Sequence, residues 1–236
     1  MKCLRQETAM LEFQEPVVLI GGGRVDTAQI ARFGDRFPLI AADSGADVAR
    51  SCGFEPVAVI GDMDSISSPD AYPSSQVMPT PDQSRTDFDK ALALVDAPLM
   101  LGLGFLGRRL DHTLAAVNTL ARHHPRPVIL LDRYDAVIFC RGDIDLDLTP
   151  GERVSLWPLE HQSFTGSAGL EWPLDGLAMR PGGQIGTSNR VAAGDGRVAI
   201  RAADGDGYVV VVDSGSVAAL AGAVVPAWQE VLQVQE

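Results

Sequence analysis

The chain has 236 residues, 46% of them hydrophobic, and a mean hydropathy of +0.08. This length fits one large domain or two small ones, and the composition provides a substantial core and argues against disorder. The formal net charge of −12 argues against nucleic acids and anionic membranes as partners.

The first half of the chain alternates short apolar runs with helical patterns. The apolar runs, each interpreted as a buried strand, are Pro16–Ile20, Pro38–Ala42, Val57–Ile60, Pro98–Leu101, Pro127–Leu131 and Ala136–Phe139. Because the runs are continuously apolar, they are typical of a parallel sheet covered by helices on both faces. The sequence therefore predicts an α/β domain over residues 1–143.

Helical patterns occupy residues 45–53, 86–95 and 110–124. Gly53 is expected just after the end of the first helix, and Thr86 is expected to cap the start of the second. The third pattern predicts one apolar face, formed by Leu110, Leu114, Val117 and Ala121.

After about Asp143 the runs shorten and the turns become rich in glycine. Alternation with a period of two in Asp143–Leu148 and Arg197–Ala202 indicates strands with one buried face. We therefore predict an all-β sandwich domain over residues 144–236. Pro226 interrupts any single helix in the tail from Ser214, and the sequence does not assign that tail a role.

Acidic residues follow the predicted strands. Asp62 and Asp64, in "GDMDS", come directly after one apolar run, Asp43 follows another, and Asp87 stands at a predicted helix start. Two carboxylates two residues apart can share a hard cation such as Mg²⁺, although Asp is also common in turns and caps. Since like charges repel, convergence of these acids on one sheet edge favours a cation.

The stretch "GLGFLGRRLDHTL" contains a G-x-G-x-x-G spacing over Gly102–Gly107, and a later apolar run ends in Asp132. This pattern is close to a dinucleotide-binding motif, so an NAD(P)-dependent oxidoreductase is one alternative. The residues after the last glycine include Arg109 and Asp111. Guanidinium groups suit phosphate oxygens, although a solvated surface pair would also explain them.

The cysteines indicate a reducing compartment. Cys3, Cys52 and Cys140 are odd in number and follow no metal or redox spacing, so we interpret them as free thiols. No apolar signal segment is visible near the N-terminus, and the longest apolar run, Val217–Trp228, is too short to span a bilayer. We expect a cytoplasmic protein without membrane attachment.

Several motifs in order resemble the thiamine pyrophosphokinase family. They are "ADSGA", "GDMDS", "DQSRTDFDKAL", "GRRLDHTLAAVN" and "GLEWPL…TSN", running from about residue 41 to 190. The resemblance implies an α/β domain, a β-sandwich and a homodimer with active sites between subunits. It also implies Mg²⁺-dependent transfer of pyrophosphate from ATP to the hydroxyl of thiamine, giving thiamine diphosphate and AMP.

The resemblance also implies roles for particular residues. The expected metal ligands are Asp62, Asp64 and Asp87. The expected ATP contacts are Asp43, Gln83, Thr86 and Arg109, and the expected catalytic group is Asp62, Asp64, Asp87, Arg109 and Asp111. The expected thiamine contacts are Trp172, Ser188 and Asn189. A third hypothesis remains, a non-catalytic nucleotide- or vitamin-binding module in which the acids are only caps and turns.

Overall fold

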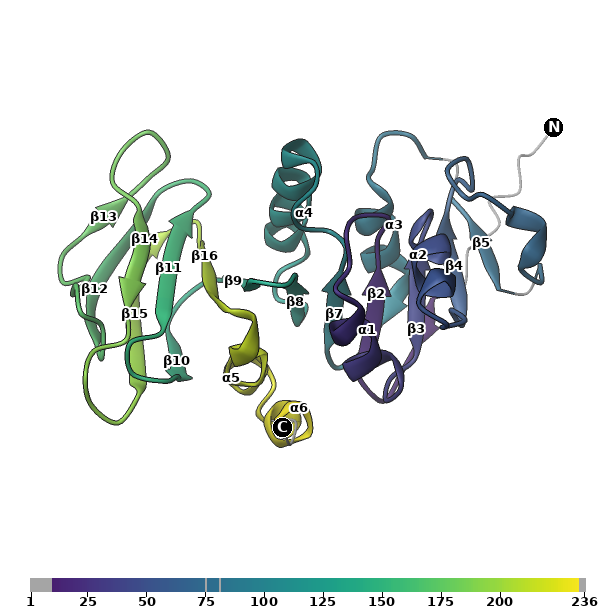
Figure 1. The fold of residues 1–236 in the computed structure, drawn as a ribbon. Coiled ribbons are helices and arrows are strands. Elements are labelled where there is room, and N and C mark those ends of the chain that lie inside the picture. The colour runs from purple at the N-terminus through teal and green to yellow at the C-terminus, as the bar shows by residue number, and fades with distance from the viewer. Residues whose placement is uncertain (1–9, 75, 81, 234–236) are drawn as a thin grey trace. The chain divides into compact units, whose positions relative to one another are not determined.

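The computed structural model describes residues 10–74, 76–80 and 82–233 (Figure 1). Cys3 and the last three residues of the tail lie outside the described residues. Contacts divide the chain into two compact units between Phe105 and Leu106. This division comes earlier than the change of texture at residue 143, because β9 (Asp135–Cys140) pairs with β16 (Tyr208–Asp213) of the second unit. The boundary at 143/144 stays a proposal for where the β-sandwich begins.

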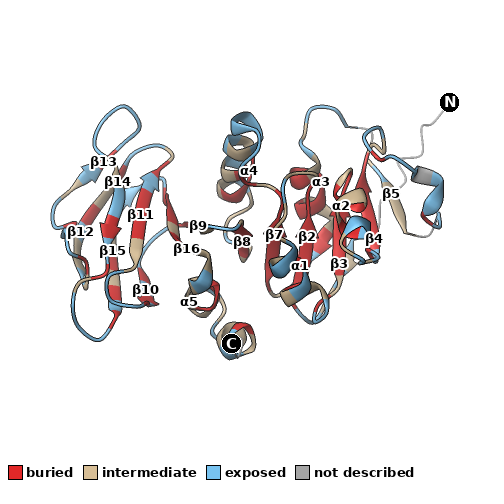
Figure 2. Ribbon diagram, viewed as in Figure 1, coloured by how far each residue is buried: buried red, intermediate tan, exposed pale blue. Residues whose placement is uncertain are grey.

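The first unit is built on a parallel sheet. Its strands are β2 (Val17–Ile20), β3 (Leu39–Ala42), β4 (Ala58–Gly61), β5 (Val77–Pro79) and β7 (Met100–Leu103). They lie in the order β7-β2-β3-β4-β5, and every neighbouring pair is parallel. All residues of β2, β3, β4 and β7 are buried, as the continuous apolar runs predict (Figure 2). A small parallel pair, β1 (Leu11–Glu12) with β6 (Val95–Asp96), is separate from this sheet.

Helices connect these strands. They are α1 (Thr27–Gly34), α2 (Gly45–Ser51) and α3 (Asp87–Leu94), with a 3₁₀ turn, η1, at Pro69–Ala71. The predicted helices at α2 and α3 are confirmed, whereas α1 was not predicted. Its start is fixed by Asp26, whose side chain accepts a hydrogen bond from the Ala28 N–H. Thr86 caps α3 as expected, accepting from the Asp89 N–H.

The second unit contains two antiparallel sheets. One has the order β14-β11-β16-β9-β8, and the other the order β10-β15-β12-β13. The remaining strands are β8 (Val128–Leu131), β10 (Ile144–Asp147), β11 (Arg153–Pro158), β12 (Gln162–Ala168), β13 (Ala178–Met179), β14 (Gly186–Arg190) and β15 (Arg197–Gly205). In β10 buried and exposed residues alternate, as predicted. The structure thus has a mixed α/β part followed by an antiparallel β part.

The pairing of β8 with β9 differs from the expectation. Both runs were predicted in a parallel sheet, but they form an antiparallel hairpin. Only residues 132–134 separate the two strands, and a parallel connection needs a much longer crossover. The Asp132 carboxylate accepts from the N–H groups of Tyr134 and Asp135, which closes the turn.

Helices of the second unit also differ in detail. The predicted apolar face of α4 (Leu110–His123) is wrong, because Leu110 is 74% and Leu114 61% exposed. The buried positions are Ala116, Thr119 and Leu120, and α4 contacts β9. The tail forms a 3₁₀ turn, η2 (Ser214–Ser216), then α5 (Val217–Val224), η3 (Pro226–Trp228) and α6 (Gln229–Leu232), so the predicted interruption at Pro226 is confirmed. Within the described chain, no helix is long and apolar enough to cross a membrane.

Candidate active site

Carboxylates gather at the carboxyl ends of β3 and β4. Asp43 follows β3, and Asp62 and Asp64 follow β4, so parallel neighbouring strands deliver them to the same edge of the sheet. One oxygen from each of these side chains lies within 4.8 Å of the others. Such an oxygen-only donor set matches the preference of Mg²⁺.

Asp43 is the most buried of these acids. Its exposed fraction is 5%, and its Oδ1 has no hydrogen-bond partner among the described residues. Burial raises the pKa of Asp43, and the charges of Asp87 and Asp62 act in the same direction. A buried carboxylate oxygen without a partner is unfavourable, so this group fits contact with a cation.

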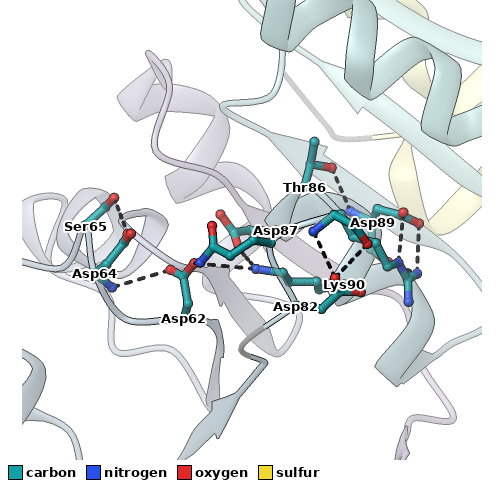
Figure 3. Close-up of polar contacts among 11 residues, drawn as sticks. Asp62, Asp64, Ser65, Asp82, Thr86, Asp87, Asp89 and Lys90 are labelled. Atoms are coloured by element: carbon teal, nitrogen blue, oxygen red, sulfur yellow. Dashed lines mark hydrogen bonds and ion pairs between the residues drawn. The ribbon is translucent and has the colours of Figure 1, made fainter.

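Asp62 is oriented by several neighbours (Figure 3). Gln83 Nε2 donates to its Oδ2 at 2.5 Å, and the Asp64 N–H lies 3.5 Å from its Oδ1. Desolvation alone would raise the pKa of Asp62, but these hydrogen bonds and the charge of Lys90 outweigh it and lower the pKa. The Ser65 hydroxyl donates to Asp64 Oδ1 at 2.8 Å. The carboxylate of Asp62 is therefore held ready in its charged form.

Lys90 is a residue of this site that sequence analysis missed. It lies on α3 with only 4% of its side chain exposed, and its Nζ is 2.9 Å from Asp87 Oδ1 and 3.8 Å from Asp62 Oδ2. Asp87 thus pairs with this ammonium, while the group within 4.8 Å comprises Asp43, Asp62 and Asp64. Lys90 follows Asp87 by three positions on a helix, a spacing that allows the two side chains to pair. This spacing does not show that the Lys90 side chain is buried, so the sequence did not single it out.

The loop before α3 is fixed by Arg85 and Asp89. Two nitrogens of Arg85 reach the two carboxylate oxygens of Asp89 at 2.9 Å each, and Asp89 is 1% exposed. The Thr86 hydroxyl caps the helix, as described above. These contacts give the loop a defined shape and so position Gln83. Sequence analysis missed both Arg85 and Asp89 as supporting residues.

Arg109 and Asp111 lie at the start of α4 in the second unit. Arg109 Nη2 is 2.6 Å from Asp111 Oδ2, and both side chains are more than half exposed. The hydrogen bond from Arg109 lowers the pKa of Asp111. Arg109 is the residue before the first helical position, so Asp111 lies in the first turn rather than at the cap. This exposed guanidinium is accessible to an anionic ligand.

Trp172, Ser188 and Asn189 come together in the second unit. Trp172 is 52% exposed, whereas Asn189 on β14 is only 5% exposed. The Asn189 amide accepts from the Trp172 N–H at 3.2 Å and donates to the Trp172 carbonyl at 2.7 Å. The Ser188 N–H donates to the buried Ser155 hydroxyl at 2.9 Å, a supporting contact that sequence analysis missed.

Unusual backbone conformations coincide with these motifs. In the described part of the chain, the non-glycine residues with positive φ are Asp43, Met63, Arg108 and Ser188. Each is a predicted site residue or the direct neighbour of one. Side chains rarely adopt this conformation, and it recurs at functional sites where surrounding contacts enforce it.

The glycine-rich motif has a structural explanation. Gly102 lies inside β7, and the Gly104 carbonyl accepts from the Gly23 N–H at 3.0 Å. A Cβ added at Gly23 would lie 2.3 Å from that carbonyl oxygen, so the loops after β2 and β7 require glycine to approach each other. Asp132 closes the β8–β9 turn. None of these features supports the oxidoreductase alternative.

Comparison with known proteins gives consistent matches. The model of the thiamin pyrophosphokinase catalytic domain matches residues 36–130, and that of the thiamin pyrophosphokinase vitamin B1 binding domain matches residues 143–205. Thiamin pyrophosphokinase 1 of Caenorhabditis elegans is 30% identical over 58% of this chain, and thiamine pyrophosphokinase 1 of Arabidopsis thaliana is 30% identical over 68%. The chain spans 63% and 67% of the lengths of these relatives.

Solved structures agree on the fold. Thiamin pyrophosphokinase from Candida albicans matches with a TM-score of 0.73 and 18% identity, covering 87% of this chain and 93% of that one. The enzyme from Geobacillus thermodenitrificans matches with a TM-score of 0.69 and 23% identity, covering 84% of this chain and 97% of that one. The predicted fold class of an α/β domain followed by a β domain is thereby confirmed.

Proposed function

Because the chain belongs to the thiamin pyrophosphokinase family, we propose that it transfers the pyrophosphoryl group of ATP to the hydroxyl of thiamine. The products would be thiamine diphosphate and AMP. The observation that carries this proposal is the set of oxygens from Asp43, Asp62 and Asp64 at one sheet edge, with the Asp43 Oδ1 unpaired among the described residues. In open α/β sheets ligands bind at this edge.

We propose Mg²⁺ as the metal at this edge. The donor set consists of carboxylate oxygens from Asp43, Asp62 and Asp64, and it includes one buried oxygen that lacks a hydrogen bond. Asp87, expected as a ligand from the resemblance, would act beside the metal through its pair with Lys90. When bound here, Mg²⁺ would neutralise phosphate oxygens and orient the pyrophosphoryl group of ATP.

Side chains of the first unit at this edge, together with a charged pair of the second unit, are proposed to position the reactants. Gln83 holds Asp62, and the Arg85–Asp89 contact holds the loop that carries Gln83. Transfer of a phosphoryl-type group depends more on positioning and charge balance than on covalent catalysis. Arg109, with its exposed guanidinium, is suited to balance negative charge that develops on the phosphate oxygens, and Asp111 keeps it oriented.

We propose that the second unit binds thiamine. Trp172 presents an exposed indole, and Ser188 is exposed beside the buried Asn189. The electron-rich face of an indole attracts organic cations, and thiamine carries a cationic thiazolium ring. The family model of the vitamin B1 binding domain covers all of these residues, which supports the assignment.

We further propose a cytoplasmic homodimer with the active site at the subunit interface. The family resemblance motivates this assembly, and the exposed Leu110 and Leu114 on α4 offer apolar surface for a subunit contact. The free thiols of Cys52 and Cys140 agree with a reducing compartment.

The test is a turnover assay with ATP, MgCl₂ and thiamine, in which AMP and thiamine diphosphate are both quantified. The purified wild-type protein should form the two products in equal amounts. Asp62→Asn keeps the size of the side chain and should abolish Mg²⁺-dependent turnover, while its circular dichroism spectrum stays that of the wild type. If thiamine binds without turnover, the binding-module hypothesis replaces this one. Binding of NADH would instead favour the oxidoreductase.

A further inference from the structure

The buried amide of Asn189 is committed to backbone groups. Its Oδ1 accepts from the N–H groups of Trp172 at 3.2 Å and Arg190 at 2.8 Å, and its Nδ2 donates to the Trp172 carbonyl at 2.7 Å. An amide side chain offers two acceptor sites and two donors, so both acceptor sites are filled. With an exposed fraction of 5%, Asn189 offers almost no surface to a ligand.

The segment that Asn189 holds is tied down at further points. The Glu171 N–H donates to the Arg190 carbonyl at 2.8 Å, and the Leu174 N–H donates to the Ser167 hydroxyl at 2.9 Å. Both backbone polar groups of Trp172 are therefore bonded to one side chain. Glu171 directly before it is bonded to β14, and Leu174 two positions after it is bonded to β12. Despite these bonds, Trp172 as a residue remains 52% exposed.

We propose that Asn189 is a positioning residue, which fixes Trp172 as a rigid aromatic platform for thiamine and does not itself contact the vitamin. This inference rests on the proposed function for the identity of the ligand. A platform fixed before binding loses less conformational freedom when the ligand arrives, and stacking on an indole depends on the orientation of the ring. Asn189 thus contributes to thiamine affinity through Trp172.

The experiment separates a positioning role from a contact role. In a background that carries Trp157→Phe and Trp228→Phe, Trp172 is the only tryptophan, because the sequence has three, and its fluorescence can be excited selectively. Asn189→Ala removes all three hydrogen bonds. We expect lower fluorescence anisotropy of Trp172 without any ligand, a KM for thiamine raised about tenfold, and unchanged KM for ATP and kcat.

Two further variants guard against a general loss of structure. Asn189→Asp keeps both accepted hydrogen bonds but replaces the donated one by repulsion between a carboxylate oxygen and the Trp172 carbonyl, so we expect changes of the same sign. Tyr208→Phe is the matched control, since it removes a hydrogen bond from a buried side chain to the Gly142 carbonyl in the same unit. It should leave both the anisotropy and the KM for thiamine unchanged.

The outcomes are distinguishable. A raised KM for thiamine with unchanged anisotropy would show that Asn189 contacts the vitamin directly and would overturn the inference, as would unchanged values of both. If Asn189→Ala does not fold, the Asn189→Asp variant decides in the same way. A wild-type protein without turnover would refute the proposed function, while the ligand-free anisotropy would still decide whether Asn189 positions Trp172.

Discussion

Replacing Lys90 with methionine tests whether its ammonium balances the acidic cluster. Methionine has a similar length and no charge, so the variant removes the ammonium that now pairs with Asp87 and Asp62 beside the acidic cluster. We expect the free energy of unfolding to fall in metal-free buffer. We also expect added MgCl₂ to stabilise this variant more than the wild type, since the divalent ion supplies the missing positive charge.

The magnitude follows from the geometry of the Lys90–Asp87 pair. At 2.9 Å and an effective dielectric constant of about 20, the attraction is about 6 kcal/mol. Most of this is offset by desolvation of the ammonium, and breaking a fully buried pair costs about 3–5 kcal/mol. The Asp87 side chain is 36% exposed, so we reduce the expected loss to about 2–3 kcal/mol. For a chain of this size that loss lowers the midpoint of thermal unfolding by about 4–12 °C.

The assay is thermal unfolding followed by circular dichroism, with and without millimolar MgCl₂. Arg197→Met is the matched control, because it also removes one positive charge, but from an exposed ion pair with Asp195. It should shift the midpoint by no more than about 3 °C and leave the MgCl₂ effect unchanged. If Lys90→Met behaves like this control, the ammonium does not balance the cluster and the reasoning fails.

Other expectations concern the carboxylate edge and the core. The folded-state pKa of Asp43 is raised, so the stability it contributes is present at low pH and is lost as the pH rises through that pKa. Asp43→Asn should therefore raise the metal-free unfolding midpoint at pH 7, and an advantage that persists at acidic pH would contradict this. Gly45→Ala places a Cβ 1.9 Å from the Ile20 carbonyl oxygen and should cost more than about 2 kcal/mol by denaturant unfolding. Gly215→Ala, which meets no atom within 4 Å, should be nearly neutral, and equal losses would refute the steric argument. Burial raises the pKa of Cys140 to about 12, so a thiol reagent at pH 8 should modify it only after unfolding, as mass spectrometry can show.

Local patterns in the sequence determined much of the first unit. The apolar runs at β2, β3 and β4 predicted buried parallel strands, because only a strand covered on both faces is apolar throughout. The Thr86 hydroxyl, followed by acidic residues in the next turn, predicted that Thr86 caps the N-terminus of α3. The position of Asp62 and Asp64 directly after a strand predicted their place at the carboxyl edge. Each of these inferences uses residues that are neighbours along the chain.

The tertiary structure decided what depends on segments that are distant along the chain. The burial of Lys90 beside Asp62 was not predictable, because spacing along α3 does not show what packs over it. The sequence suggested an apolar face on α4, but the tertiary structure buries a different side of the helix. Asn189 reaches back 17 positions to the backbone of Trp172. Burial and long-range hydrogen bonds arise only when separate segments meet, and the resulting contacts set the charge and orientation of the site.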